Sequence, residues 1–163
     1  AEAVLRGWAG MELTGTVEDY YKSGIKASMD YYGIANDKAQ AYIDGEKALT
    51  GKVFEGKGKE KQLEAIITQK WMAIFPNGNE GWAEFRRTDY PALANQLTNN
   101  SGGDVPMGKN IKRILYPFSE NNNTYFTSHP ELQKVNTQGT RLWWDVADTN
   151  DADGHRLQPN NFR

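Results

Sequence analysis

The strongest constraint on the fold is an apolar stripe that ends abruptly at a proline-containing turn. From Glu60 onward, side chains that can pack against a core recur three or four residues apart: Leu63, Ile66, Ile67, Lys70, Trp71, Ile74 and Phe75. This spacing predicts one amphipathic helix with a single buried face. Residues 76–79 read Pro-Asn-Gly-Asn, which is typical of a turn, so the helix is expected to end there.

A second, shorter helix is expected directly after this turn. Glu80 suits the positive end of a helix, and Arg86 and Arg87 suit its negative end. Pro91 disfavours helical backbone at Tyr90, so the second helix is expected to stop before it. The sequence therefore predicts two helices that meet at a sharp corner, and we call residues 60–91 the corner segment.

Further helices are expected upstream of the corner segment. Residues 1–8 have a helical pattern without a preceding capping residue. Thr16 and Asp19 form the pattern of a capping box, and Gly33 is expected to end the helix that follows. One face of that helix contains Val17, Tyr20, Tyr21, Ile25, Ser28, Met29 and Tyr32. Asn36 and Asp37 are expected to cap a short helix, and residues 45–61 to form a flexible connection.

The second half of the chain has a different composition and predicts mostly irregular structure. Its expected elements are a long polar loop at 95–110, a short strand at 111–116, a polar turn at 119–124, a helix that starts at Pro130 with Ser128 as cap, and a buried extended segment at 142–146. We therefore expect a mainly α fold, an irregular helical domain with long loops and a few short strands.

Length and charge limit the kind of protein. A chain of 163 residues can bury one core, so a single domain over residues 1–163 is expected. The formal net charge of −2 produces no field that would attract nucleic acid or an anionic membrane surface. The sequence contains no cysteine, which excludes disulfides, thiol nucleophiles and cysteine metal sites. It also contains no apolar run long enough for a transmembrane helix.

Two carboxylates one helical turn apart, Glu80 and Glu84, raise the question of catalysis. A glycosidase needs a pair of such groups across the bond that it cleaves. A structural explanation accounts for the same residues, because Glu80 favours the start of a helix and Glu84 can pair with Arg86 or Arg87. We therefore expect no enzyme activity and no catalytic residue.

No strong metal motif is present, and we expect neither a metal nor a cofactor. His129 and His155 lack a second histidine at ligand spacing. Residues 149–154 resemble the middle of a calcium loop, since Asp151 and Asp153 precede a glycine. However, Thr149 and Asn160 occupy the positions where such a loop has Asp and Glu, so a polar turn is the preferred interpretation.

Aromatic side chains are the best candidates for contact with a ligand. Sugar rings stack on aromatic faces, while amides and carboxylates bind their hydroxyl groups. Trp71, Trp82 and one of the pair at 143–144 fall on apolar faces and are expected in the core. Trp8, Tyr125 and Phe126 lie beside polar loops instead, and we predict these three as ligand-binding residues. The amides of residues 121–123 could bind sugar hydroxyls, although turn formation explains them equally well.

Several motifs, in this order along the chain, resemble those of one protein family. They are AEAVLRGW at 1–8, QKW at 69–71, WAEFRRT at 82–88, YP at 90–91, RILYPFSE at 113–120 and LWWD at 142–145. Together they resemble the SusD/RagB family of outer-membrane nutrient-binding lipoproteins. Two positions depart from the family pattern: Gly81 replaces a usual alanine, and Asp89 replaces a usual glycine.

The resemblance implies a function that the motifs alone do not define. SusD-like proteins are helical, contain tetratricopeptide-type helices, and are attached to the cell surface by an N-terminal lipid. The resemblance implies that this chain is the C-terminal part of such a protein, without the lipid-bearing cysteine. It further implies binding of an oligosaccharide or other nutrient, which is handed to a SusC-like TonB-dependent transporter. The alternative is a helical protein-interaction module that binds no sugar of its own.

Overall fold

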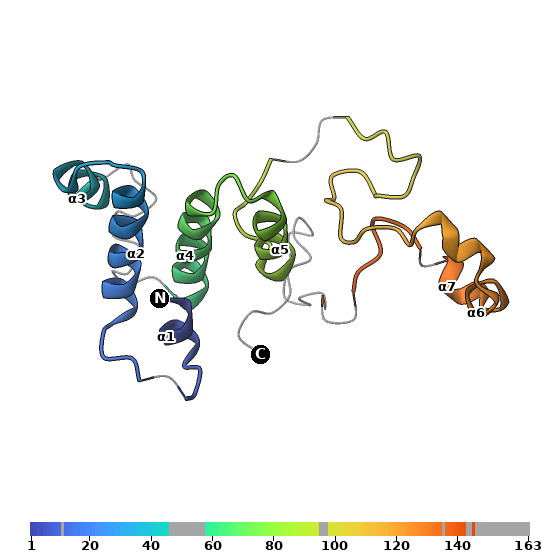
Figure 1. Ribbon diagram of the computed structural model, residues 1–163, viewed down its shortest axis with the longest axis horizontal. Coiled ribbons are helices and arrows are strands. Elements are labelled where there is room, and N and C mark those ends of the chain that lie inside the picture. The colour runs from blue at the N-terminus through green and yellow to red at the C-terminus, as the bar shows by residue number, and fades with distance from the viewer. Residues whose placement is uncertain (11, 46–57, 95–97, 135, 143–144, 146–163) are drawn as a thin grey trace. The chain divides into compact units, whose positions relative to one another are not determined.

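The computed structural model describes residues 1–10, 12–45, 58–94, 98–134, 136–142 and 145. These residues form two compact units, the first up to Pro91 and the second from Ala92 onward. Figure 1 labels α-helices in both units. The expectation of a single domain over residues 1–163 stays a prediction, because the two units are defined by their contacts and not by separate unfolding.

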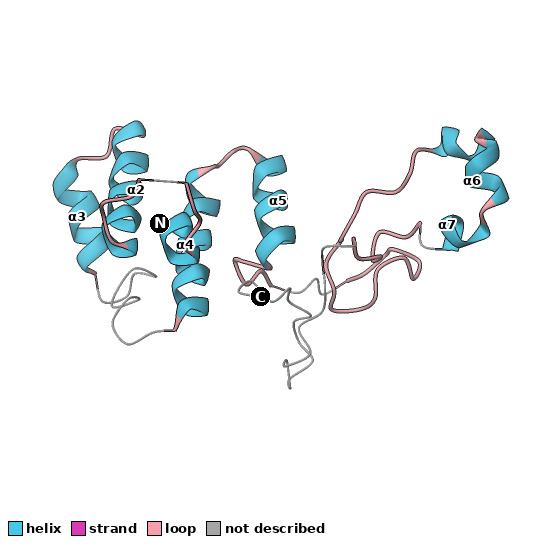
Figure 2. Cartoon of the chain, turned by 90° about the horizontal axis from the view of Figure 1, so that it is seen from below, coloured by secondary structure: helices cyan, strands magenta, loops and turns pink. Residues whose placement is uncertain are grey.

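Unit 1 consists of five helices packed around a small apolar core. Their bounds are α1 at Glu2–Arg6, α2 at Val17–Tyr31, α3 at Asn36–Asp44, α4 at Lys59–Ala73 and α5 at Gly78–Thr88. Helix α4 is central, since it contacts α1, α2 and α5, while α3 packs on α2 (Figures 1 and 2). Leu63 and Ile67 of α4 are completely buried, and Tyr21, Ile25, Ile43 and Tyr90 complete the core around them.

Helix α2 begins and ends as the sequence predicts. The backbone N–H of Asp19 donates to the Thr16 hydroxyl at 3.1 Å, and the Asp19 carboxylate accepts from the backbone N–H of Thr16 at 2.9 Å. This reciprocal pair satisfies two amides that the first turn leaves without helical partners. Gly33 follows the helix with φ +71°, which confirms it as the terminating residue. The predicted cap of α3 is wrong, because Ala35 takes the capping position and Asn36 is already helical.

The corner segment is confirmed as two helices with a tight turn between them. Asn77 caps α5 by accepting a hydrogen bond from the backbone N–H of Glu80, and α5 ends before Tyr90. The predicted buried face of α4 is correct only for its first part. The last turn of α4 is partly exposed, with Trp71 at 37%, and Phe75, which follows the helix end at Ala73, is 73% exposed. Trp71 is therefore not the core residue that the sequence predicted.

Unit 2 consists of loops around short helical turns: η1 at Phe118–Asn122, α6 at Thr124–Ser128 and α7 at Pro130–Lys134. The predicted short strands are wrong, because the described residues contain helices and loops only (Figure 2). The amides of Lys112 and Arg113 both donate to the carbonyl of Gln138, but no strand ladder forms among the described residues, and Ile114 is 72% exposed. Pro130 does start a helix, but Ser128 does not cap it. Its hydroxyl lies within α6 and donates to the carbonyl of Tyr125.

Other expectations fall partly or wholly outside the described residues. These are residues 46–57 of the connection predicted at 45–61, residues 95–97 of the polar loop, the tryptophans at 143–144 and the possible calcium loop with His155. The end of that predicted connection is wrong, because α4 already begins at Lys59. Of the segment at 142–146 the structure describes Leu142 and Asp145. Asp145 is buried, and its carboxylate pairs with the Lys112 ammonium at 3.3 Å.

The left-handed residue that ends α5 provides a stability test. Asp89 has φ +58°, in the left-handed region of the backbone. Glycine adopts this conformation without strain, Asn and Asp tolerate it, and other side chains disfavour it. We expect Asp89→Gly to be more stable than Asp89→Ala by about 1 kcal/mol, because both variants lose the carboxylate and only alanine keeps a strained Cβ. Urea unfolding of the two variants measures the difference. Equal midpoints would show that this backbone geometry is not maintained in solution.

Candidate functional site

The motif residues of unit 1 form a chain of ion pairs that links three helices. Arg87 donates to both oxygens of Glu2, at 2.6 and 2.8 Å, and to Oε2 of Glu84 at 2.6 Å. Lys70 donates to the other oxygen of Glu84 at 2.6 Å, and Arg6 donates to Glu2 at 2.8 Å. The network therefore fastens α1 and α4 to α5. Bidentate hydrogen bonding between a guanidinium and a carboxylate makes such ion pairs directional as well as strong.

Two members of this network, Glu2 and Arg87, are held in their ionised forms. Burial opposes ionisation of Glu2, but the hydrogen bonds from Arg87 and Arg6 outweigh it and hold the pKa of that carboxyl below its usual value. Burial likewise opposes the charge of Arg87, and its bonds to Glu2 and Glu84 raise the pKa of the guanidinium. Glu84 is thus engaged by two cations, as the structural interpretation predicted. This arrangement has the form of a scaffold and not of an acid–base pair.

The two motif tryptophans of the corner segment pack at its surface. The Arg86 guanidinium lies 4.4 Å from the ring centre of Trp82, which is half-buried. Trp71 lies against α5 where Gly81 occurs, and a Cβ built at Gly81 would be 3.2 Å from its Nε1. The absence of a side chain at Gly81 therefore allows this close contact between α4 and α5.

The first predicted ligand residue, Trp8, belongs to unit 1. It follows Gly7, which ends α1 with φ +67°, and its side chain is 51% exposed. Its backbone N–H donates to the carbonyl of Ala3, so the base of the side chain is fixed by the helix end. An exposed ring on a fixed backbone is suited to stacking on a flat ligand.

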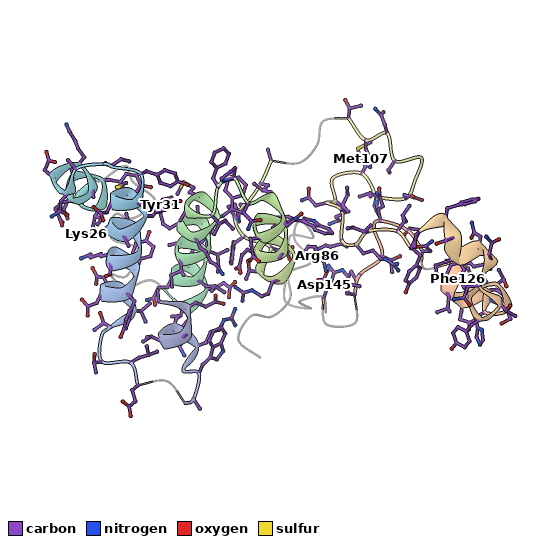
Figure 3. The ribbon with its side chains drawn as sticks, viewed as in Figure 1. Lys26, Tyr31, Arg86, Met107, Phe126 and Asp145 are labelled. Carbon is purple, nitrogen blue, oxygen red and sulfur yellow. The ribbon has the colours of Figure 1, made fainter. Side chains whose placement is uncertain are left out.

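The other two predicted residues, Tyr125 and Phe126, belong to α6 of unit 2 and have opposite environments. Tyr125 is 66% exposed, and its ring stacks on His129 with 4.0 Å between centroids. Phe126 is buried at 6% and meets Tyr116 edge-on (Figure 3). The Asn123 side chain caps α6 by accepting from the backbone N–H groups of Tyr125 and Phe126. Tyr125 thus presents a ring to solvent, while Phe126 supports the fold beneath it.

A groove that the sequence did not predict lies between α2 and α4 in unit 1. Its volume is about 500 Å³, and its walls come from one face of α2, the end of α4 and the side of α3. The lining residues of α2 are Tyr20, Tyr21, Gly24, Ile25, Ser28 and Met29. Only Tyr21 and Ile25 of this face are buried, and its other residues form the wall of the groove.

Hydrogen bonds hold two tyrosines of the groove in place. The Tyr32 hydroxyl donates to the carbonyl of Phe75 at 2.7 Å, and Gln69 Nε2 donates to the Tyr42 hydroxyl at 2.9 Å. At the floor, burial raises the pKa of the Tyr21 hydroxyl, with a smaller contribution from Tyr42 and an opposing one from Gln69. The hydroxyl therefore remains neutral at physiological pH.

The described residues offer no alternative metal centre. They contain no cluster of three or more His, Asp or Glu side chains placed to hold an ion. Within the same residues, none of the helices combines the length and the apolar character needed to cross a bilayer.

Comparison with known families identifies the motifs. The family model described as "Susd and RagB outer membrane lipoprotein" matches residues 1–145. The chain matches none of the curated proteins compared with it.

Solved structures agree with this match. A SusD homologue from Bacteroides thetaiotaomicron VPI-5482 superposes with a TM-score of 0.73 at 28% identity, covering 88% of this chain and 35% of that one. A SusD homologue from Bacteroides vulgatus ATCC 8482 gives 0.69 at 34% identity, covering 91% and 34%. A structure named as a chitin-binding protein gives 0.59 at 30% identity, covering 89% and 31%. The chain thus spans about a third of the length of these relatives.

Proposed function

The chain belongs to the SusD/RagB family, and from this premise we propose that it binds a glycan or similar nutrient at the surface of an outer membrane and hands it to a SusC-like TonB-dependent transporter. The observation that carries the proposal is the family match over residues 1–145. The similarity to a protein named as chitin-binding supports a glycan as the ligand. The proposed role is binding and delivery, without catalysis. Attachment to the membrane through a lipid is part of the same proposal.

The exposed rings of Trp8 and Tyr125 are the proposed contacts with the glycan. Each is more than half exposed and sits on a helix end fixed by backbone hydrogen bonds. Shallow stacking of this kind gives modest affinity, which suits a protein that must release its ligand to a transporter. Phe126, buried beneath Tyr125, contributes by holding α6 in shape.

Native affinity electrophoresis tests the proposed function directly. The chain is run through gels that contain glycol chitin, laminarin, xylan or pullulan, and reducing ends released in the same lanes are assayed. We expect retardation by at least one polymer without product. Released product would overturn the proposal in favour of an enzyme. Migration unchanged by every polymer would overturn glycan binding by this chain and favour the interaction-module alternative.

Removal of the exposed rings should weaken retention without unfolding the chain. We expect Trp8→Ala and Tyr125→Ala each to raise the dissociation constant by roughly 2- to 10-fold, because one aromatic stacking contact contributes about 0.5–1.5 kcal/mol. Phe118→Ala is the control, since it removes a ring that is 85% exposed but is not one of the proposed contacts. Affinity gels at several polymer concentrations give the constants. Equal constants for wild type and both variants would show that neither ring contacts the glycan.

The proposed transfer to the transporter requires a separate contact with protein. The polar loop at 95–110 is a suitable place, since long surface loops frequently carry recognition. Replacing this loop with a Gly/Ser linker of equal length is expected to reduce co-purification with a SusC-like partner while glycan retention stays unchanged. Parallel loss of both properties would argue against separate surfaces.

A further inference from the structure

We infer that the groove between α2 and α4 is a binding site for one or two sugar rings, in addition to the exposed rings of Trp8 and Tyr125. This inference rests on the proposed glycan-binding function and assigns to it a position in unit 1. A groove of about 500 Å³ is within the size range of small-molecule sites. One end is open to solvent, because Tyr32, Ile34 and Met72 are 53%, 43% and 40% exposed.

The first supporting observation is a glycine in the middle of α2. Glycine inside a helix is less favourable than alanine by about 1 kcal/mol, so its presence calls for a reason. The fold itself provides none, because a Cβ built at Gly24 meets no atom within 4 Å. The space above Gly24 belongs to the groove, whose wall it forms. A ligand that approaches the backbone closely at this point would explain the missing side chain.

The second observation is the chemistry of the walls. Four of the eight tyrosines of the chain line the groove: Tyr20, Tyr21, Tyr32 and Tyr42. Among its described lining residues there is no phenylalanine or tryptophan, so every aromatic ring there carries a hydroxyl. Ser28 and Gln69 add a further hydroxyl and an amide. Apolar ring faces with hydroxyl and amide groups at their edges match a ligand that has both CH-rich faces and hydroxyl groups.

The third observation is charge. Lys70 is the one lining side chain, among those described, that carries a charge, and its ammonium is bonded to Glu84 at 2.6 Å. No carboxylate lines the groove. A neutral ligand fits this lining. A charged ligand would lose its hydration there without gaining an ion pair, because Lys70 is already paired with Glu84.

The walls are also fixed before any ligand arrives. Tyr32 is held by the carbonyl of Phe75, and Tyr42 is held by Gln69. A pre-organised site loses less conformational entropy on binding, so two small rings suffice for measurable affinity. An amphipathic helix is the other occupant that such a groove could take, because Ile25, Ile66 and Met72 also line it, and the tyrosine hydroxyls are what favours a sugar instead.

Filling the groove from Gly24 tests the inference without harming the fold. Gly24→Leu places an isobutyl group in the groove, and leucine is a better helix former than glycine, so the urea midpoint should equal or exceed that of wild type. Ala27→Leu adds a leucine side chain to the same helix at an exposed position outside the groove. With the polymer that retards wild type most strongly, we expect Gly24→Leu to weaken retention by about tenfold or more and Ala27→Leu by less than about twofold.

The outcomes separate the site from the function. Retention of Gly24→Leu equal to that of wild type would overturn the groove as a sugar site and leave glycan binding in place. If Gly24→Leu kept glycan retention but lost the SusC-like partner, the groove would be a protein-docking surface and the inference would be wrong. If wild type bound none of the four polymers, the proposed function would fail, and the groove inference with it.

Discussion

Replacing Ile67 with alanine is expected to lower the free energy of unfolding of unit 1 by about 3 kcal/mol, one of the two largest effects that we predict. Ile67 lies in the centre of α4 and has no exposed surface. Helix α4 contacts α1, α2 and α5, so closing the cavity would require whole helices to move. The cost therefore includes both the lost burial and the remaining void.

Urea denaturation followed by circular dichroism measures this loss. The control is Ile114→Ala, which removes the same atoms from a side chain that is 72% exposed, and it should change stability by less than about 0.5 kcal/mol. Similar effects of the two substitutions would show that α4 is not the centre of the core.

Arg87→Ala is expected to destabilise unit 1 by about 2–3 kcal/mol. The substitution leaves two carboxylates, Glu2 and Glu84, without their shared guanidinium, and these side chains are only 13% and 9% exposed. Removal of one partner from a buried pair costs about 3–5 kcal/mol, and the 38% exposure of Arg87 itself reduces that figure. Lys22→Ala is the matched control, because its pair with Glu18 is of similar length but nearly half exposed on both sides. It should cost less than about 0.5 kcal/mol.

The same network predicts how stability depends on pH. The pKa of Glu2 is lower in the folded chain than its ordinary value, so its ionised form stabilises the fold above that ordinary value, near pH 4.5. This contribution is lost as the pH falls through the lower, folded pKa. In Arg87→Ala the acid-induced loss should be smaller, because the largest stabilising partner of the carboxylate is gone. Parallel pH profiles for wild type and variant would contradict this assignment.

The sequence predicted the helices better than the surfaces between them. Caps and breakers are local, so Thr16 and Gly33 mark the two ends of α2 correctly, and residues 76–79 predict the corner, although α5 begins at Gly78 inside that predicted turn. Periodicity reports which side of a helix is apolar but not what lies opposite. For this reason the sequence does not reveal that the face of α2 lines a groove, or that Trp71 and Phe75 are exposed.

Two failures have a specific physical cause. The alternation at 111–116 suggests a strand, but the amides of Lys112 and Arg113 share one acceptor, the carbonyl of Gln138, and the described residues form no ladder there. The groove was missed because its walls come from helices about forty residues apart in the chain. The sequence does contain one indication of the groove. Gly24 and Ser28 lie among aromatic residues on one face of α2, and such small residues leave space that large ones would fill.

The link between Glu2 and Arg87 also affects the order in which the protein can assemble. The two residues are separated by 85 positions, so α1 cannot be fastened to α5 until the ribosome has released the entire corner segment. The contacts of α1 with α2 and α4 do not involve Arg87, so they can form earlier in synthesis. The apolar core of unit 1 can therefore assemble first, and the ion pairs that tie α1 to α5 close it last.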